Sequence, residues 1–212
     1  MAARHRDSEL FRGDVLPITL KTVAVCAFAL SAWWAFMFWH PQHLRNLPEL
    51  ASWGRADRER LVTRAFFLVI AASLVGNFFS GWLARRVGYR RSIAAMCLAL
   101  GLAMIGSFAT ARSASSLVTV WLPTVGFFSG VFGLFTMYMP PLFPTLLRTT
   151  GAGFCYNIGR VAAAFGTVFF GLFAPVGDFR HALLGVGLLL LTATAMALTL
   201  PEPGELGGPG SA

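Results

Sequence analysis

Long apolar stretches, each followed by a short polar or charged segment, recur along the whole chain. The clearest pair, residues 65–84 and 92–111, contains no Asp, Glu, Lys or Arg and flanks a short arginine-rich segment. A bilayer core is about 30 Å thick, and an α-helix needs about 20 residues at 1.5 Å each to cross it. No stretch alternates polar and apolar residues as a membrane β-barrel wall would, so transmembrane helices are predicted.

Six stretches reach the length of a transmembrane helix. The predicted helices cover residues 18–39, 62–84, 92–110, 117–139, 151–175 and 182–200. The fourth is followed by Pro140, Pro141 and Pro144, which cannot continue a helix. The pattern therefore predicts an all-α membrane protein with a six-helix bundle.

Polar ends bound one predicted transmembrane domain, residues 18–200. Residues 1–17 lack the short apolar core and cleavage site of a removable signal peptide, so we expect a cytoplasmic N-terminal segment. Residues 201–212 are polar and rich in Gly and Pro, which favours a disordered cytoplasmic tail.

Composition supports a membrane location for the chain. Hydrophobic residues make up 56% of the 212 residues and charged residues only 12%, whereas a soluble domain has about 25% charged residues. A net charge of +8 would suggest nucleic acid in a soluble domain. Here the basic residues lie mostly between apolar stretches, where they set membrane topology. We therefore expect a lipid bilayer as partner and no nucleic acid.

The basic residues also predict the orientation of the chain. Six spans place both termini on one side of the membrane. The positive-inside rule works best on short loops, and the short segment 85–91 carries four arginines. We therefore predict a multi-pass protein of the plasma (inner) membrane, with both termini in the cytoplasm.

Two segments three spans apart resemble each other. GWLARRVGYR (81–90) is similar to GLFAPVGDFR (171–180), with one residue deleted. Three spans reverse the direction of the chain, so the two segments would face opposite sides of the membrane. This arrangement is that of a 3+3 inverted repeat, which is common in transporters.

Charged groups inside the predicted helices are few. All nine acidic residues lie outside the six stretches, so no carboxylate proton relay is predicted on these helices. Arg160 lies within the fifth, where an unpaired arginine costs about 2.5–3.5 kcal/mol on insertion scales. Arg160 either faces a wet cavity and binds an anionic substrate or a carboxylate partner, or its helix starts later, near Gly153, and the side chain reaches the cytoplasmic surface.

Aromatic and amide side chains are further candidates for a cavity lining. Trp33 and Trp34 could stack on a ring-bearing substrate or belong to an aromatic belt at the outer interface. Asn77 and Asn157 lie at membrane depth, where an amide contacts substrate or makes an interhelical hydrogen bond. Small residues recur with helical spacing in two helices and predict close helix packing; they are Gly126, Gly130 and Gly133, and Gly159, Ala163 and Gly166.

Motifs for catalysis or metal binding are not found in the sequence. His40 and His43 flank Pro41 without a third ligand nearby, so no metal site is predicted. No phosphate loop or hydrolase elbow occurs. We therefore expect neither an enzyme nor a bound cofactor.

Two segments carry a resemblance to a known family. GWLARRVGYRR (81–91) resembles the Gly-x-Leu-x-Asp-Arg-x-Gly-Arg-Arg signature of major facilitator superfamily transporters. The second segment, YMPPLFPTLLRTTGAGFCYNIGR (138–160), is similar to the family's Tyr-x-Pro-Glu-Leu-Phe-Pro-Thr segment. Within the family, it most resembles metabolite:proton symporters and sugar-porter-like members. The candidate residues at signature positions are Gly81, Arg85, Arg86, Gly88, Arg90 and Arg91 in the first segment, and Pro140, Pro141 and Arg148 in the second.

The resemblance implies the C-terminal six-helix half of a twelve-span transporter that moves a small organic metabolite by alternating access. The partner would be a missing N-terminal half or a second half-transporter chain. An alternative is a truncated, non-transporting fragment or a half-size membrane subunit that needs a partner half. The family's first, second, fourth and fifth helices line the cavity, which implies as lining candidates Trp33, Trp34, Asn77, Phe128 and Asn157.

The sequence departs from the family pattern at two acidic positions. Arg85 replaces the aspartate of the first signature, and Pro141 replaces the glutamate of the second. In the family these acids belong to a charge network that holds the outward-facing state, and the loop acid faces a helix N-terminus in the other half. An arginine there opposes the helix dipole at a cost of about 0.3–1 kcal/mol. We therefore expect a weakened latch.

Overall fold

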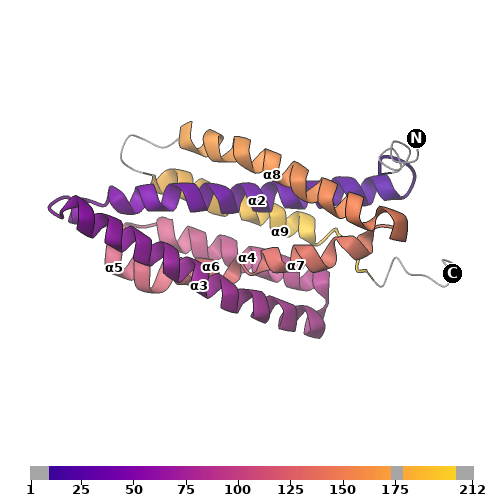
Figure 1. The fold of residues 1–212 in the computed structure, drawn as a ribbon, viewed down its shortest axis with the longest axis horizontal. Coiled ribbons are helices and arrows are strands. Elements are labelled where there is room, and N and C mark those ends of the chain that lie inside the picture. The colour runs from indigo at the N-terminus through magenta and orange to yellow at the C-terminus, as the bar shows by residue number, and fades with distance from the viewer. Residues whose placement is uncertain (1–9, 173–178, 204–212) are drawn as a thin grey trace.

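The computed structural model describes residues 10–172 and 179–203. Within these residues the chain is helical, without strands, and six helical segments are long and apolar enough to cross a membrane (Figure 1). This confirms the predicted all-α class and the six spans. The predicted terminal segments, 1–17 and 201–212, lie partly outside the described residues. The second copy of the predicted repeat, 171–180, lies mostly outside them.

Five of the six spans are single helices. They are α2 (Val15–Arg45), α3 (Arg55–Val87), α4 (Tyr89–Phe108), α8 (Arg148–Leu172) and α9 (Arg180–Ala197). The fourth span is composite, formed by α5 (Ala114–Ser116), the π-helical segment η2 (Leu117–Trp121), α6 (Leu122–Phe128) and α7 (Val131–Tyr138). Three short 3₁₀ turns complete the described elements: η1 (Pro48–Leu50), η3 (Pro140–Leu142) and η4 (Thr145–Leu147).

The start of α2 and the end of α9 lie at the same end of the bundle (Figure 1). There the ammonium of Lys21 donates to the carbonyl oxygen of Thr199 at 3.3 Å. We call this end the termini end and the other the loop end. The α3–α4 corner lies at the termini end, so the order of the helices places the arginine-rich segment on the same side as both termini.

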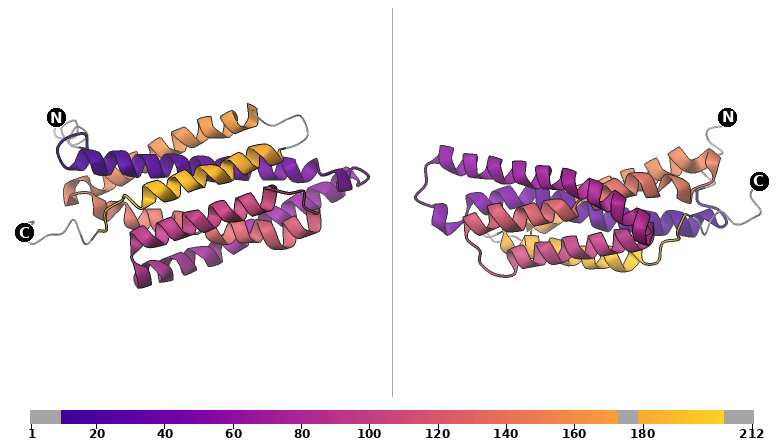
Figure 2. Two further views of the ribbon diagram at one scale, coloured as in Figure 1. Left: turned by 180° about the vertical axis from the view of Figure 1, so that it is seen from behind. Right: turned by 90° about the horizontal axis from the view of Figure 1, so that it is seen from below.

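The helix α2 lies at the centre of the bundle and packs along α8 and α9. Seen from behind, α9 lies between α2 and α4, which pack on its two sides (Figure 2). On the opposite face, α3 packs against α6 and diverges from α2 towards the termini end (Figure 1). The third and sixth spans therefore back the bundle, while α2, α3 and α8 share the other face.

Both predicted small-residue stripes are packing surfaces. A side chain on Gly126 would overlap the backbone of Val69, and one on Gly76 would overlap the backbone of Phe127, so α3 and α6 approach to backbone contact. On the fifth span, a Cβ on Gly159 would lie 2.8 Å from the Cβ of Cys26 in α2. Small residues permit this approach in membranes, where packing rather than hydrophobicity holds helices together.

The first two helices extend beyond their predicted ends because polar residues continue the turn, whereas the third and sixth end at Phe108 and Ala197 instead of residues 110 and 200. The first ends at Arg45 instead of residue 39 and passes through Pro41, and the second begins at Arg55 instead of residue 62. The predicted loop 40–61 is thereby reduced to 46–54. At 31 and 33 residues, these helices are about 47 and 50 Å long and exceed the hydrocarbon core, so their polar turns lie outside it.

Candidate functional site

A groove on the shared face of α2, α3 and α8 encloses about 490 Å³. Its floor is formed by α2, one wall by α8, and the other wall by an aromatic ring from α3. The lining side chains are Trp34, Met37, Phe38, Phe66, Arg160, Ala163, Ala164 and Thr167. The groove thus joins one cation to three aromatic rings, in a size range typical of small-molecule sites.

Arg160 lies at the middle of α8. The helix begins at Arg148 and ends at Leu172, so Arg160 is twelve residues, about 18 Å, from either end. The assumption of a later start, near Gly153, is therefore wrong, because α8 begins five residues earlier. Among residues 10–172 and 179–203, Arg160 forms no ion pair, and its side chain lines the groove.

The two adjacent tryptophans have different surroundings. Trp34 is 48% exposed and lies on the groove floor. Trp33 is turned into the bundle, with its ring centre 5.6 Å from that of Phe36 and 5.7 Å from that of Phe132. Neighbours along a helix point about 100° apart. Only Trp34 is therefore placed to meet a molecule in the groove.

The other predicted lining residues lie away from the groove. Asn77 is exposed on α3 and donates to the carbonyl of Ser73 at 2.9 Å. Asn157 is exposed on α8 and donates to the carbonyl of Gly153 at 2.9 Å. Phe128 is half-buried, with its ring edge-on to Phe127 at 5.3 Å. Of the sequence candidates, the structure brings together only Trp34 and Arg160.

Two aromatic residues of the groove were not among the sequence candidates. Phe38 is four residues after Trp34, so both occupy one face of α2. Phe66 of α3 faces His40 of α2, with ring centres 6.0 Å apart, and His40 is stacked on Phe36 at 4.5 Å. Helical spacing from Trp34 could have indicated Phe38, whereas Phe66 depends on how α2 and α3 pack.

Towards the loop end, the groove continues into a second hollow of about 640 Å³. The two hollows share Met37, Phe38 and Phe66. The second one is also lined by Arg45 and Glu59, the ion pair that joins α2 to α3. The groove is therefore apolar at mid-span and becomes polar towards the loop end.

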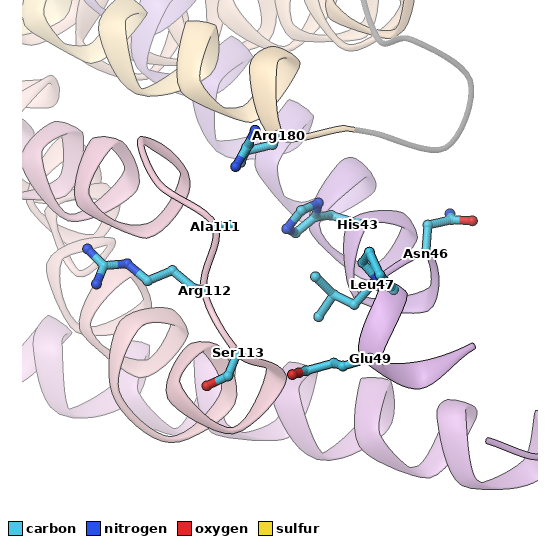
Figure 3. A pocket seen from close by; sticks show the side chains of 9 residues that line it. His43, Asn46, Leu47, Glu49, Ala111, Arg112, Ser113 and Arg180 are labelled. Atoms are coloured by element: carbon cyan, nitrogen blue, oxygen red, sulfur yellow. The ribbon is translucent and has the colours of Figure 1, made fainter. Parts of the chain in front are cut away.

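A separate pocket of about 540 Å³ lies at the loop end, between the α2–α3 connection and the segment 111–113 (Figure 3). His43 and Leu47 point towards that segment, whereas Arg112 points away from the pocket. The guanidinium of Arg112 lies over the Trp121 ring at 4.3 Å and donates to the Gly106 carbonyl at 3.0 and 3.3 Å. The Glu49 carboxylate accepts from the backbone N–H of Ala114. The contacts of Arg112 and Glu49 thus stabilise the loop connections.

Both segments that carry the family resemblance lie at the termini end. In the first, only Gly88 separates α3 from α4, with φ +89°. Arg85 and Arg86 are in the last turn of α3, and Arg90 and Arg91 are in the first turn of α4. A Cβ on Gly81 would meet no atom within 4 Å. The predicted loop is therefore the single residue Gly88. We call residues 85–91, which include the adjoining helix turns, the arginine-rich corner.

The second segment forms two short turns between the fourth and fifth spans. Pro140 and Pro141 begin η3, one residue after the end of α7, and Arg148 begins α8. Proline lacks a backbone N–H and fits the first turn of a helix, where the N–H groups have no partner within the helix. The prolines thus end the fourth span as predicted.

No protein-family profile matches the chain. The chain is 33% identical over 208 residues to a gallate transporter of Pseudomonas putida. The aligned region covers 96% of this chain and 42% of the transporter. It is 28% identical over 123 residues to a cis,cis-muconate transport protein of Acinetobacter baylyi. Here the aligned region covers 58% of this chain and 28% of the relative. The aligned part is less than half of either relative. The chain is thus similar to proteins named as transporters of small organic molecules.

Proposed function

We propose that the chain is the C-terminal half of a major-facilitator-type secondary transporter for small organic acids, with the groove around Arg160 as its half of the substrate site. The observation that carries the proposal is the mid-span position of Arg160 beside Trp34 in an aromatic groove. Substrate sites of such transporters lie near the bilayer midplane, at the interface between repeats. The similarity to the gallate and muconate transporters supports the same assignment.

The chemistry of the groove fits an unsaturated or aromatic carboxylate. A guanidinium can donate two parallel hydrogen bonds to a carboxylate, and such charge-assisted bonds are roughly twice as strong as neutral ones. The ring of Trp34, with Phe38 and Phe66 beside it, offers flat apolar surface for a planar substrate. Gallate and cis,cis-muconate, named for the two relatives, are both unsaturated carboxylates.

A second half is needed to close the groove. The outward faces of α3 and α8 carry large exposed apolar side chains, among them Phe67, Phe78 and Phe165. A covering half, joined to this chain or supplied by another, would complete the cavity and allow alternating access by rocking. In this proposal both termini lie in the cytoplasm and the bundle lies in the inner membrane.

Ligand binding to the purified chain in lipid nanodiscs tests the substrate site. Gallate is compared with its neutral amide, 3,4,5-trihydroxybenzamide, by quenching of tryptophan fluorescence. A hydrogen bond to a charged group contributes about 1.5–3 kcal/mol, so Arg160→Gln should weaken gallate binding by about ten- to a hundredfold. The amide should bind equally to both proteins, and Arg64→Gln is the control for loss of one arginine.

Two results would contradict the site. Equal affinity of the parent for gallate and its amide would show that the carboxylate is not recognised. Equal loss in Arg160→Gln and Arg64→Gln would show a general charge effect. Uptake by vesicles that contain the chain alone, with crosslinking to detect self-pairing, then separates a half-transporter from a non-transporting fragment.

A further inference from the structure

The second hollow, of about 640 Å³ towards the loop end, combines a cation with flat apolar surface. Arg45 lines it together with the rings of Phe38 and Phe66. The same two rings line the mid-span groove, so the two hollows are continuous. We call the second one the Arg45 hollow. Its lining repeats the chemistry found around Arg160, a guanidinium beside aromatic rings.

Arg45 lies too far from the mid-span groove to hold the same small molecule as Arg160. It follows Trp34, on the groove floor, by eleven residues, about 16 Å along α2. A single-ring acid does not span this length. The Arg45 hollow is therefore a separate place for a ligand, between the groove and the loop end.

Two polar side chains of the Arg45 hollow make no hydrogen bond to the part of the chain that the structure describes. They are the amide of Gln42 on α2 and the hydroxyl of Thr63 on α3. In contrast, the hydroxyls of Thr124 and Thr167 donate to carbonyls of their own helices at 2.7 and 2.9 Å. An amide and a hydroxyl can each donate and accept. Gln42 and Thr63 are thus available to polar substituents of a ligand.

The Glu59 carboxylate occupies the place on Arg45 that a carboxylate ligand would take. It accepts from Nε at 2.8 Å and from Nη2 at 2.9 Å. The pair is partly exposed, so water screens it and it opens easily. Arg55 and Arg58 also act electrostatically on the Glu59 carboxylate. Glu59 therefore keeps cationic neighbours when it leaves Arg45.

We propose that the Arg45 hollow is a second, weaker carboxylate site, in which the carboxylate of an aromatic or unsaturated acid displaces Glu59 from Arg45. The guanidinium would give the ligand the two parallel hydrogen bonds that Glu59 now accepts. The rings of Phe38 and Phe66 would contact its apolar part. The site is weaker than the groove because Glu59 competes for the same donors. Its role as an access site to the groove rests on the proposed function, whereas the binding of a carboxylate at Arg45 does not.

Gallate binding to the full chain in nanodiscs, measured by equilibrium dialysis in an Arg160→Gln background, tests the second site. Adding Arg45→Gln removes charge-assisted hydrogen bonds and should weaken binding by about tenfold or more. Adding Glu59→Gln removes the competitor and should tighten binding by about tenfold. Arg64→Gln and Asp57→Asn, which remove one arginine and one acid outside the lining of the hollow, are the matched controls.

Both Arg45→Gln and Glu59→Gln break the same ion pair, so a purely structural role predicts that they change binding alike. Opposite changes, absent from the two controls, support the site. Changes in one direction, or no larger than in the controls, would overturn it.

The neutral amide of gallate, 3,4,5-trihydroxybenzamide, tests recognition of the carboxylate. In Arg160→Gln with Glu59→Gln, it should bind about tenfold more weakly than gallate. Equal binding of the two would show that Arg45 does not recognise a carboxylate. The groove itself is tested separately, because that proposal fails when Arg160→Gln alone leaves the affinity for gallate unchanged.

Discussion

The guanidinium of Arg45 and the carboxylate of Glu59 form a two-pronged ion pair, with Nε–Oε1 at 2.8 Å and Nη2–Oε2 at 2.9 Å. The pair joins the last residue of α2 to the first turns of α3, where the two helices begin to diverge. Its side chains also line the polar end of the groove. The contact therefore links α2 to α3 at the loop end, beside the groove.

Exchanging the partners tests the ion pair. The side chains are 34% and 45% exposed, so water screens the pair and its contribution to stability is small. Arg45→Glu alone places two acids together and should lower the melting temperature in detergent, whereas adding Glu59→Arg should restore most of the loss. A double variant no more stable than Arg45→Glu would show that the pair makes no specific contribution. High salt should reduce the effect.

The contact between α3 and α6 predicts a strong effect of one added methyl group. A Cβ on Gly126 would overlap the Val69 backbone, which cannot move aside as a side chain can. Overpacking typically costs about 1–3 kcal/mol, so Gly126→Ala should lower stability by this amount in thermal unfolding. Gly81→Ala, in α3 with no atom within 4 Å of the new Cβ, is the control and should gain about 0.5–1 kcal/mol from the better helix former. Equal effects of the two variants would contradict the close approach of the helices.

The sequence predicted the six helices but not all of their ends. Apolar length locates a span because about 20 residues cross the bilayer. It does not locate the last turn, since a helix such as α2 continues into water through Pro41 to Arg45. The break between Phe128 and Val131 also escaped prediction, because no charged residue interrupts the fourth span there.

Residue chemistry predicted part of the groove. Arg160 and Trp34 stand out by residue type within apolar stretches, whereas Phe66 resembles every other apolar residue of α3. In a membrane bundle the lipid-facing and protein-facing sides are equally apolar, so periodicity does not reveal which ring meets a neighbouring helix. The Glu202 carboxylate accepts from the first backbone N–H groups of α4, and this contact depends on the path of the chain after α9, which no local pattern encodes.

Substitution of the two adjacent tryptophans should change different properties: Trp34→Ala should weaken ligand binding, and Trp33→Ala should lower stability. Trp34→Ala removes a half-exposed ring from the groove and should weaken gallate binding by about fivefold, the loss of one aromatic contact, with little change in melting temperature. Trp33→Ala removes ring contacts with Phe36 and Phe132 and should cost up to about 3 kcal/mol of stability. Binding by calorimetry and unfolding by circular dichroism give both values. The reverse pattern would place Trp33, not Trp34, against the substrate.

Gly88 and Glu202 should show coupled effects on stability. Gly88 has φ +89° and ψ 163°, a region that only glycine enters readily, so Gly88→Ala should cost about 1–3 kcal/mol from backbone strain. The Glu202 carboxylate accepts from the backbone N–H groups of Tyr89 and Arg90 at 3.2 and 2.9 Å. The added Cβ would lie 2.8 Å from a Glu202 oxygen and displace this carboxylate. In a Glu202→Ala background the second cost is absent, so the loss on adding Gly88→Ala should be smaller by about 0.5–1 kcal/mol. Unfolding of the four proteins in one detergent gives the coupling energy, and strictly additive losses would show that Gly88 and Glu202 do not interact.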